Sequence, residues 1–327
     1  MAEGLFVFLK RDLREDLAAG LRPAPATPLT GGGCRKSPPS TGKVSQKPLS
    51  RRERGWGEGV EGQRSMPFTT PSGGLWLTRW ATISLLVGLI LFLACGYHGG
   101  FSRLNTLAAE LPAPLWQWLT VLGDERVAFA LTLFFTRRCP RVFWTLIGAA
   151  LFAIAFTHSL KPLFSALRPP AVLEAGVFNL IGPGLRENSF PSGHTVTAAT
   201  FFGVWVYTVR ARWLRAFLIL LAVAAGLSRV AVGVHWPVDV AVGLAGGAMA
   251  ARLGVSLAAR SERLGSEPIV HLALVTLAAG MAVSLLLWDG GYPGAATMQQ
   301  LLAVAALGFA VYAYLIDPIL RWSALRN

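Results

Sequence analysis

Three short stretches of this chain carry residue types suited to chemistry, and each interrupts an otherwise apolar sequence. They read KPLFSALRPP (161–170), RENSFPSGH (186–194) and SRVAVGVHWPVDV (228–240). Ionisable side chains are costly in or beside a lipid bilayer, so residues of this kind are candidates for function. The three stretches therefore define the candidate site.

The first shared feature is a set of three cations, Lys161, Arg168 and Arg229. Arginine binds phosphate bidentately and lysine acts as a point charge, so a phosphate is their natural ligand. Lys161 and Arg168 are seven residues apart, which is two helical turns. A helix would place both side chains on one face before Pro169 and Pro170 end it.

Ser192 and Gly193 directly precede an apolar run that we expect to be helical. The start of a helix offers free backbone N–H groups and the positive end of the helix dipole, and both attract anions. Gly193 allows the backbone to approach the anion closely, and the Ser192 hydroxyl adds a donor. With the three cations, these residues predict a site that binds a phosphate and stabilises its charge in a transition state.

Two histidines, His235 and His194, are candidates for the nucleophile and for the acid that protonates the leaving group. In HWPVD, Pro237 is expected to be the first residue of a helix, so His235 lies just outside it and Asp239 lies in its first turn. Asp239 can reach back to His235, fix its tautomer and stabilise its imidazolium form, which makes His235 a candidate nucleophile. His194 can protonate the leaving oxygen.

The sequence holds no carboxylate cluster suited to a metal pair. The residues therefore favour metal-independent phosphoryl transfer through a phosphohistidine, with no cofactor and no metal ligands.

Together the three stretches resemble the signature of the type-2 phosphatidic acid phosphatase superfamily. Residues 161–169, 191–194 and 228–239 match its three parts in order and in spacing. One part alone would be weak evidence, whereas the full set is highly specific. The resemblance covers roughly residues 80–257, and two apolar stretches after that core depart from the family pattern.

The resemblance implies a mostly helical membrane fold with a core of six spans. It implies His235 as the nucleophile, Asp239 as the residue that orients it, and His194 as acid and base. It also implies the residues that surround the phosphate, which are Lys161, Arg168, Ser192, Gly193 and Arg229.

The composition is that of a polytopic membrane protein. Of 327 residues, 53% are hydrophobic and 14% are charged, whereas a soluble domain carries roughly a quarter charged residues. The net charge of +13 could indicate nucleic acid binding. The arginines, however, are scattered between apolar runs and form no basic stripe, so no nucleic acid partner is expected. Three widely separated cysteines disfavour a disulfide framework or a zinc site.

The apolar pattern predicts an all-α bundle of transmembrane helices, with a six-span phosphatase core and about two extra C-terminal spans. Gly123, Asp124 and Glu125 interrupt the second span. That region can therefore also be an interfacial helix followed by a short span that Asp124 caps. The expected spans are 81–97, 115–136, 142–160, 195–209, 214–230, 238–257, 269–288 and 299–316.

Residues 1–65 differ from the rest of the chain, because they are rich in Pro, Gly, Arg and Ser and show no sustained period. We expect a disordered tail or a misassigned start there. The phosphatase core is expected at 66–258 and a two-span extension at 259–327.

The distribution of basic residues predicts the orientation in the membrane. With eight spans and the N-terminus inside, 12 of the 18 Lys and Arg after residue 66 fall on the cytoplasmic side. Counting membrane crossings from residue 161 puts all three polar stretches on one face, whether or not the second span crosses the membrane. The charge rule makes that face extracytoplasmic. We therefore expect an outward-facing site in the plasma (inner) membrane, with both termini in the cytoplasm.

These features predict an integral membrane lipid phosphatase whose substrate is a phosphate monoester or diphosphate lipid. Candidate substrates are undecaprenyl diphosphate, phosphatidic acid, phosphatidylglycerophosphate and lipid A phosphates, with isoprenyl diphosphate slightly favoured. The apolar loop 171–190 is expected to help bind the lipid. His158 matches no motif position, and we interpret it as structural.

Two alternatives stay open at the level of the sequence. A lipid phosphotransferase would use the same phosphohistidine but pass the phosphoryl group to another lipid. A polytopic transporter of lipids or anions would use the charges to line a path. The sequence predicts neither a monomer nor an oligomer.

Overall fold

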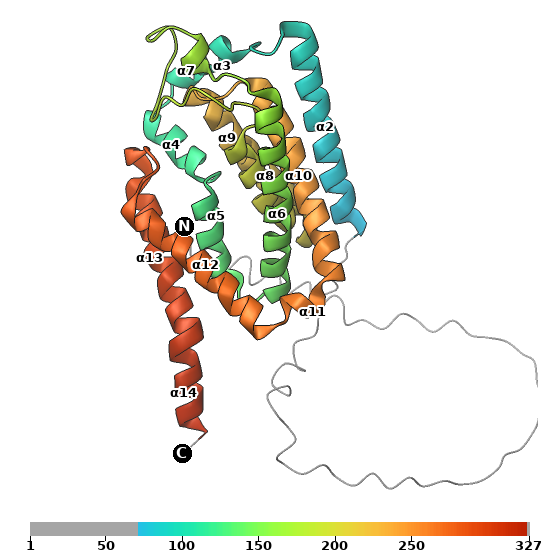
Figure 1. Ribbon diagram of the computed structural model, residues 1–327, viewed down its shortest axis with the longest axis vertical. Helices are drawn as coiled ribbons and strands as arrows, with labels where there is room; N and C mark the ends of the chain where they lie inside the picture. The colour runs from blue at the N-terminus through green and yellow to red at the C-terminus, as the bar shows by residue number, and fades with distance from the viewer. Residues whose placement is uncertain (1–70, 326–327) are drawn as a thin grey trace, which may run out of the picture. The chain divides into compact units, whose positions relative to one another are not determined.

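The computed structural model describes residues 71–325, so the tail expected at 1–65 lies outside the described residues. Within 71–325 the chain is a bundle of helices without strands (Figure 1). The expectation of an all-α fold is confirmed.

The helices fall into a core bundle, a connecting group and a C-terminal group. The core helices are α2 (Pro71–Cys95), α6 (Pro140–Phe164), α8 (Gly193–Thr208), α9 (Arg212–Ala231) and α10 (Pro237–Arg260). The connecting helices are α3 (Phe101–Ala109), α4 (Ala113–Val121), α5 (Glu125–Thr132), η1 (Leu133–Phe135), α7 (Pro169–Val172) and α11 (Glu262–Gly265). The C-terminal helices are α12 (Pro268–Leu287), α13 (Pro293–Val311), η2 (Tyr312–Ile316) and α14 (Asp317–Ala324).

Among the described residues, six helical segments are long and apolar enough to cross a membrane. They correspond to six of the eight expected spans. The other two differ from expectation, because 115–136 is divided into α4 and α5 and 195–209 forms α8, which has only 16 residues. At 1.5 Å per residue α8 is about 24 Å long, less than the ~30 Å thickness of a hydrocarbon core.

The division between α4 and α5 has a local cause. Asp124 caps α5, because its Oδ1 accepts a hydrogen bond from the Arg126 backbone nitrogen at 2.8 Å. A Cβ on Gly123 would lie 2.5 Å from the His194 carbonyl oxygen, so the break lets the chain pass close to the start of α8. The alternative of two helices with Asp124 as the cap is therefore the correct one.

α10 lies at the centre of the core and packs against α2, α6, α8 and α9 (Figure 1). Its contact faces carry small residues. A Cβ on Gly247 would lie 2.5 Å from Ala199 in α8, and one on Gly254 would lie 2.5 Å from Ala149 in α6. Small residues let membrane helices approach closely. This packing fixes α10 relative to α6 and α8.

The C-terminal helices α12 and α13 form a second layer with α4 and α5. One hydrophobic cluster joins α5, α12 and α13, and it also contains Val232 and Val234 from the turn after α9. The expected extension at 259–327 therefore shares its apolar packing with the turn that leads to His235.

The direction of the chain brings the polar stretches together. α6 and α9 end, and α8 and α10 begin, at the same end of the bundle (Figure 1). We call this the site end. The opposite end holds α11 and ion pairs between Arg141 and Glu262 and between Arg137 and Asp317.

Candidate active site

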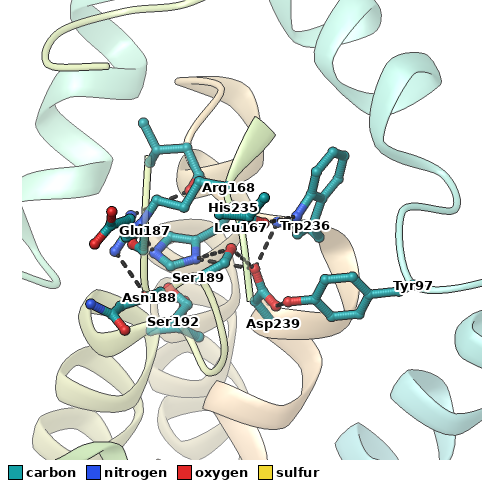
Figure 2. A network of polar contacts seen from close by, with 12 residues as sticks. Tyr97, Leu167, Arg168, Glu187, Asn188, Ser189, Ser192, His235, Trp236 and Asp239 are labelled. Carbon is teal, nitrogen blue, oxygen red and sulfur yellow. Dashed lines mark hydrogen bonds and ion pairs between the residues drawn. The ribbon is translucent and has the colours of Figure 1, made fainter. Parts of the chain in front are cut away.

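His235 lies in the turn between α9 and α10 and is almost fully buried. Its Nδ1 lies 3.2 Å from Asp239 Oδ2, and its Nε2 lies 3.1 Å from Arg168 Nη1 (Figure 2). A guanidinium can only donate, so Nε2 must accept and the ring hydrogen must be on Nδ1, directed at Asp239. The geometry thus fixes one tautomer, in which the Nε2 lone pair faces a cation.

Asp239 is fully buried in the first turn of α10, where the sequence predicted it. Its Oδ2 accepts hydrogen bonds from the Trp236 backbone nitrogen at 2.9 Å and from Ser189 Oγ at 2.5 Å. Its Oδ1 accepts one from Tyr97 Oη at 2.5 Å (Figure 2). With the His235 ring these donors satisfy the buried carboxylate, which sets its orientation.

Tyr97 and Ser189 are functional candidates that the sequence did not reveal. Ser189 stands inside the stretch RENSFPSGH, so its place among polar residues was a usable signal. Tyr97 lies two residues after the end of α2 and 142 residues before Asp239, and no local pattern links the two.

The surroundings shift the pKa of two of these groups. Burial raises the pKa of Tyr97 above its ordinary value, and the charge of Asp239 raises it further, so the phenol stays a donor. Burial lowers the pKa of His235 well below its ordinary value, and the charges of Arg168 and Arg229 lower it further. His235 is therefore neutral at pH 7, as a nucleophile must be.

Arg168 is buried at the site, but it does not extend α6. The helix ends at Phe164, Ser165 takes the left-handed conformation with φ of 44°, and Arg168 is extended. The prediction that Lys161 and Arg168 share a helix face is therefore wrong. The prediction that Pro169 and Pro170 end a helix is also wrong, because these prolines begin α7, where a fixed φ is favourable.

Backbone carbonyl groups hold the Arg168 side chain in place. Its Nε donates to the Glu187 oxygen at 2.7 Å and its Nη2 to the Asn188 oxygen at 3.3 Å (Figure 2). Its Nη1 donates to the Val234 oxygen at 3.3 Å as well as to the His235 ring. The loop before α8 and the turn before α10 thus direct the guanidinium at His235.

Arg229 lies in the last turn of α9 and is only 2% exposed. Its Nη1 donates to Thr120 Oγ1 and to Tyr292 Oη, both at 2.9 Å. Its Nε is buried and has no partner within the part of the chain that the structure describes. A buried donor without a partner is costly, and an oxyanion would satisfy it.

Ser192 is the N-cap of α8 and Gly193 is its first residue, so the helix begins two residues before the expected span of 195–209. The Ser192 hydroxyl is buried and accepts a hydrogen bond from Thr195 at 2.8 Å. A Cβ on Gly193 would lie 3.7 Å from Lys161 Nζ, so the ammonium group lies beside the start of α8. His194 follows as a half-buried residue in the first turn.

The structure thus brings all eight predicted site residues to the site end. Direct contacts join His235, Asp239 and Arg168, and a backbone hydrogen bond of 3.2 Å from Ser192 to Asp239 joins α8 to α10. Within residues 71–325, no hydrogen bond links His194 to another predicted residue. The same residues include no group of three or more side chains that could hold a metal ion.

Comparison with known proteins places this site in a family. Residues 142–263 match the PAP2 superfamily. A lipid A 1-phosphatase from Rhizobium johnstonii is 33% identical over 166 residues, which cover 43% of this chain and 67% of that protein. The chain belongs to the PAP2 superfamily. The resemblance drawn from the three polar stretches is therefore confirmed.

The chain is also similar to a second phosphatase and to a solved structure. An undecaprenyl-diphosphatase from Sulfolobus acidocaldarius is 31% identical over 137 residues, which cover 39% of this chain and 62% of that protein. The crystal structure of Aquifex aeolicus LpxE is 31% identical, with a TM-score of 0.43, and the match covers 48% of this chain and 92% of that chain. The chain spans about two thirds of the length of the two phosphatases.

This PAP2 chain is a multi-pass membrane protein and a phosphoric ester hydrolase of the lipid phosphatase type. The region matched to the family ends at residue 263, before α12 begins. The C-terminal helices and the helices α2 to α5 therefore lie outside it.

Proposed function

We propose that this PAP2 enzyme hydrolyses a phosphate monoester or diphosphate lipid through a phosphohistidine at His235, without a metal ion. The observation that carries the proposal is the tautomer of His235, with Nδ1 hydrogen-bonded to Asp239 and Nε2 3.1 Å from Arg168 Nη1. A phosphate oxygen bound by Arg168 would bring phosphorus beside the Nε2 lone pair.

In the first half of the reaction, His235 Nε2 attacks phosphorus. The N–P bond forms while the P–O bond to the lipid breaks. His194 gives a proton to the leaving oxygen, so the lipid departs as a neutral alcohol or as a phosphate. Asp239 stabilises the positive charge that develops on the His235 ring.

In the second half, a water molecule attacks phosphorus and gives a proton to His194. The N–P bond breaks, its electron pair returns to Nε2, and inorganic phosphate leaves. Arg168, Arg229 and Lys161, with the Ser192 hydroxyl and the backbone N–H of Gly193, stabilise the charge on the phosphoryl oxygens in both steps.

The lipid nature of the substrate has two supports. The relatives are named for lipid A 1-phosphate and undecaprenyl diphosphate hydrolysis. An apolar pocket of about 220 Å³ also opens beside the last turns of α9, with Leu107, Leu111 and Leu227 in its wall. The wall also includes Val230, which follows Arg229 in the chain, and an apolar wall there suits a lipid chain.

We further propose that the site faces outward from the inner membrane, with both termini in the cytoplasm. The support is the excess of basic residues at the other end of the helices, where Arg137, Arg138 and Arg141 precede or begin α6.

The test is phosphate release by the purified full-length chain from a panel of lipids in the presence of EDTA. The panel contains lipid A, undecaprenyl diphosphate, phosphatidic acid and phosphatidylglycerophosphate. We expect release without any acceptor lipid, unaffected by EDTA, and reduced about 10³-fold or more in His235→Ala.

His158→Ala is the matched control, because His158 is exposed on α6 and only its Nδ1 contacts a backbone oxygen, that of Ile154. It should retain activity. Release that EDTA abolishes, or that His235→Ala retains, would overturn the mechanism. Transfer to an added lipid without free phosphate would identify a phosphotransferase instead.

A further inference from the structure

Tyr292 reaches the candidate phosphate site from outside the region matched to the family. It lies in the connection between α12 and α13 and is 4% exposed. Its hydroxyl oxygen accepts a hydrogen bond from Arg229 Nη1 at 2.9 Å, and the Arg229 Cζ lies 5.8 Å from its ring centroid. A residue of the C-terminal helices therefore contacts a cation of the polar centre.

Two hydroxyl groups determine where the Arg229 guanidinium points. Nη1 is shared between Tyr292 and Thr120, and Thr120 also accepts a hydrogen bond from Ser228 at 2.9 Å. Thr120 belongs to α4, so neither acceptor comes from residues 142–263. Family-core residues alone therefore do not orient this guanidinium.

The connection that carries Tyr292 packs against the rest of the bundle and is hydrogen-bonded to it. A Cβ on Gly182 would lie 2.7 Å from the Tyr292 ring, and φ at Gly182 is +84°, so a glycine there lets the ring pack against the loop before α8. Arg126 Nη1 donates to the Trp288 oxygen at 2.8 Å, and the Gly294 nitrogen donates to Gln117 Oε1 at 2.7 Å. The position of the Tyr292 hydroxyl is thereby fixed from both sides.

The Tyr292 hydroxyl can contribute to the phosphate site in two ways. By accepting from Nη1 it holds one edge of the guanidinium, which sets the direction of the remaining N–H donors, including the unpartnered Nε. A phenol also keeps one hydrogen to donate, and a buried donor beside a cation is well placed for a phosphate oxygen. Donors fixed in advance cost no reorganisation when charge develops.

We propose that Tyr292 is a positioning residue of the phosphate site, through which the C-terminal helices orient Arg229 toward the phosphate. The inference rests on the proposed function, because it takes Arg229 to bind the substrate phosphate. It gives α12 and α13 a role in phosphate binding beyond spanning the membrane.

The test is Tyr292→Phe in the purified full-length protein, with inorganic phosphate as a competitive inhibitor. Phenylalanine keeps the ring against Gly182 and removes only the hydroxyl. We expect the inhibition constant for phosphate to rise about tenfold and kcat/KM to fall by a similar factor, the usual size of a lost hydrogen bond to a charged group.

Tyr312→Phe is the matched control, since Tyr312 lies in the same C-terminal helices but is 51% exposed in η2. It should leave both constants unchanged. Thr120→Val removes the other acceptor of Arg229 Nη1 and should weaken phosphate inhibition in the same direction. It therefore tests whether the orientation of Arg229 matters for phosphate binding even if Tyr292→Phe folds poorly.

Thermal unfolding separates a positioning role from a structural one. If Tyr292→Phe lowers the unfolding temperature but leaves the phosphate inhibition constant and kcat/KM at wild-type values, the inference is overturned. His235→Ala separates this failure from failure of the proposed function. If His235→Ala is inactive while Tyr292→Phe is fully active, only the proposed role of Tyr292 is rejected and the proposed function is not.

Discussion

A single hydrogen, on Nδ1 of His235, decides which nitrogen of that ring can attack. Asp239 holds it there, and Tyr97, Ser189 and the Trp236 backbone hold Asp239. The sequence predicted the pair of His235 and Asp239, because their spacing of four residues around Pro237 is a local property of a helix start. It did not predict Tyr97, whose contact depends on how α2 packs against α10.

The positive charge of Arg168 should affect how kcat/KM depends on pH. His235 must be neutral to attack, so kcat/KM falls on the acid side as the ring is protonated. Burial and the charges of Arg168 and Arg229 lower the pKa of His235. Arg168→Met removes one of these charges, so the pKa of His235 rises and the acid limb of kcat/KM moves to higher pH.

The measurement is kcat/KM against pH for wild type, Arg168→Met and Arg168→Lys with one substrate, so that ionisation of the substrate is common to all three. Arg168→Lys keeps the charge and should leave the limb in place while it lowers the rate. An acid limb that stays fixed in Arg168→Met, or moves to lower pH, would contradict this account of His235.

At the scale of elements, the starts of α8 and α10 were predictable, because Ser192-Gly193 and Pro237 are local start signals. The path from α6 to α7 was not. There the Arg168 nitrogen donates to the Arg186 oxygen at 2.9 Å and the Ser189 nitrogen donates to the Ala166 oxygen at 2.8 Å. Contacts between segments about 20 residues apart thus override the helical continuation, and they direct Arg168 toward His235 by another route.

The connection between α12 and α13 shows the same limit of sequence patterns. Its residues form a turn between two apolar runs, and nothing local marks Tyr292 as a neighbour of Arg229, 63 residues earlier. Only the packing of α12 and α13 against α4 and α5 brings the two together. Periodicity predicted these two helices but not their contact with the site.

At the scale of the whole molecule, counting crossings placed the three polar stretches on one face, and they do meet at one end of the bundle (Figure 1). The count began at residue 161, so the division of the second span into α4 and α5 did not affect it. The short α8 did not affect it either, because α8 still carries the chain from the site end toward the opposite end (Figure 1). The direction of successive helices was therefore more predictable than their length.

The proposed orientation makes a prediction about access from outside the cell. Ala175 lies in the exposed loop between α7 and α8, and Ser266 lies in the exposed connection before α12 at the opposite end. In a variant without Cys34, Cys95 and Cys139, we expect Ala175→Cys in intact cells or spheroplasts to react with a membrane-impermeant maleimide. Ser266→Cys should react only after the membrane is opened. The reverse pattern would place the site in the cytoplasm.

The central claim is that the phosphoryl group passes through His235. The most direct measurement is a rapid alkaline quench during turnover of a lipid labelled in its phosphate, followed by peptide mapping. The account predicts label on the peptide that contains His235 in the wild-type protein and none in His235→Ala. Turnover of the wild-type protein without labelled protein, or label on a different residue, would contradict it.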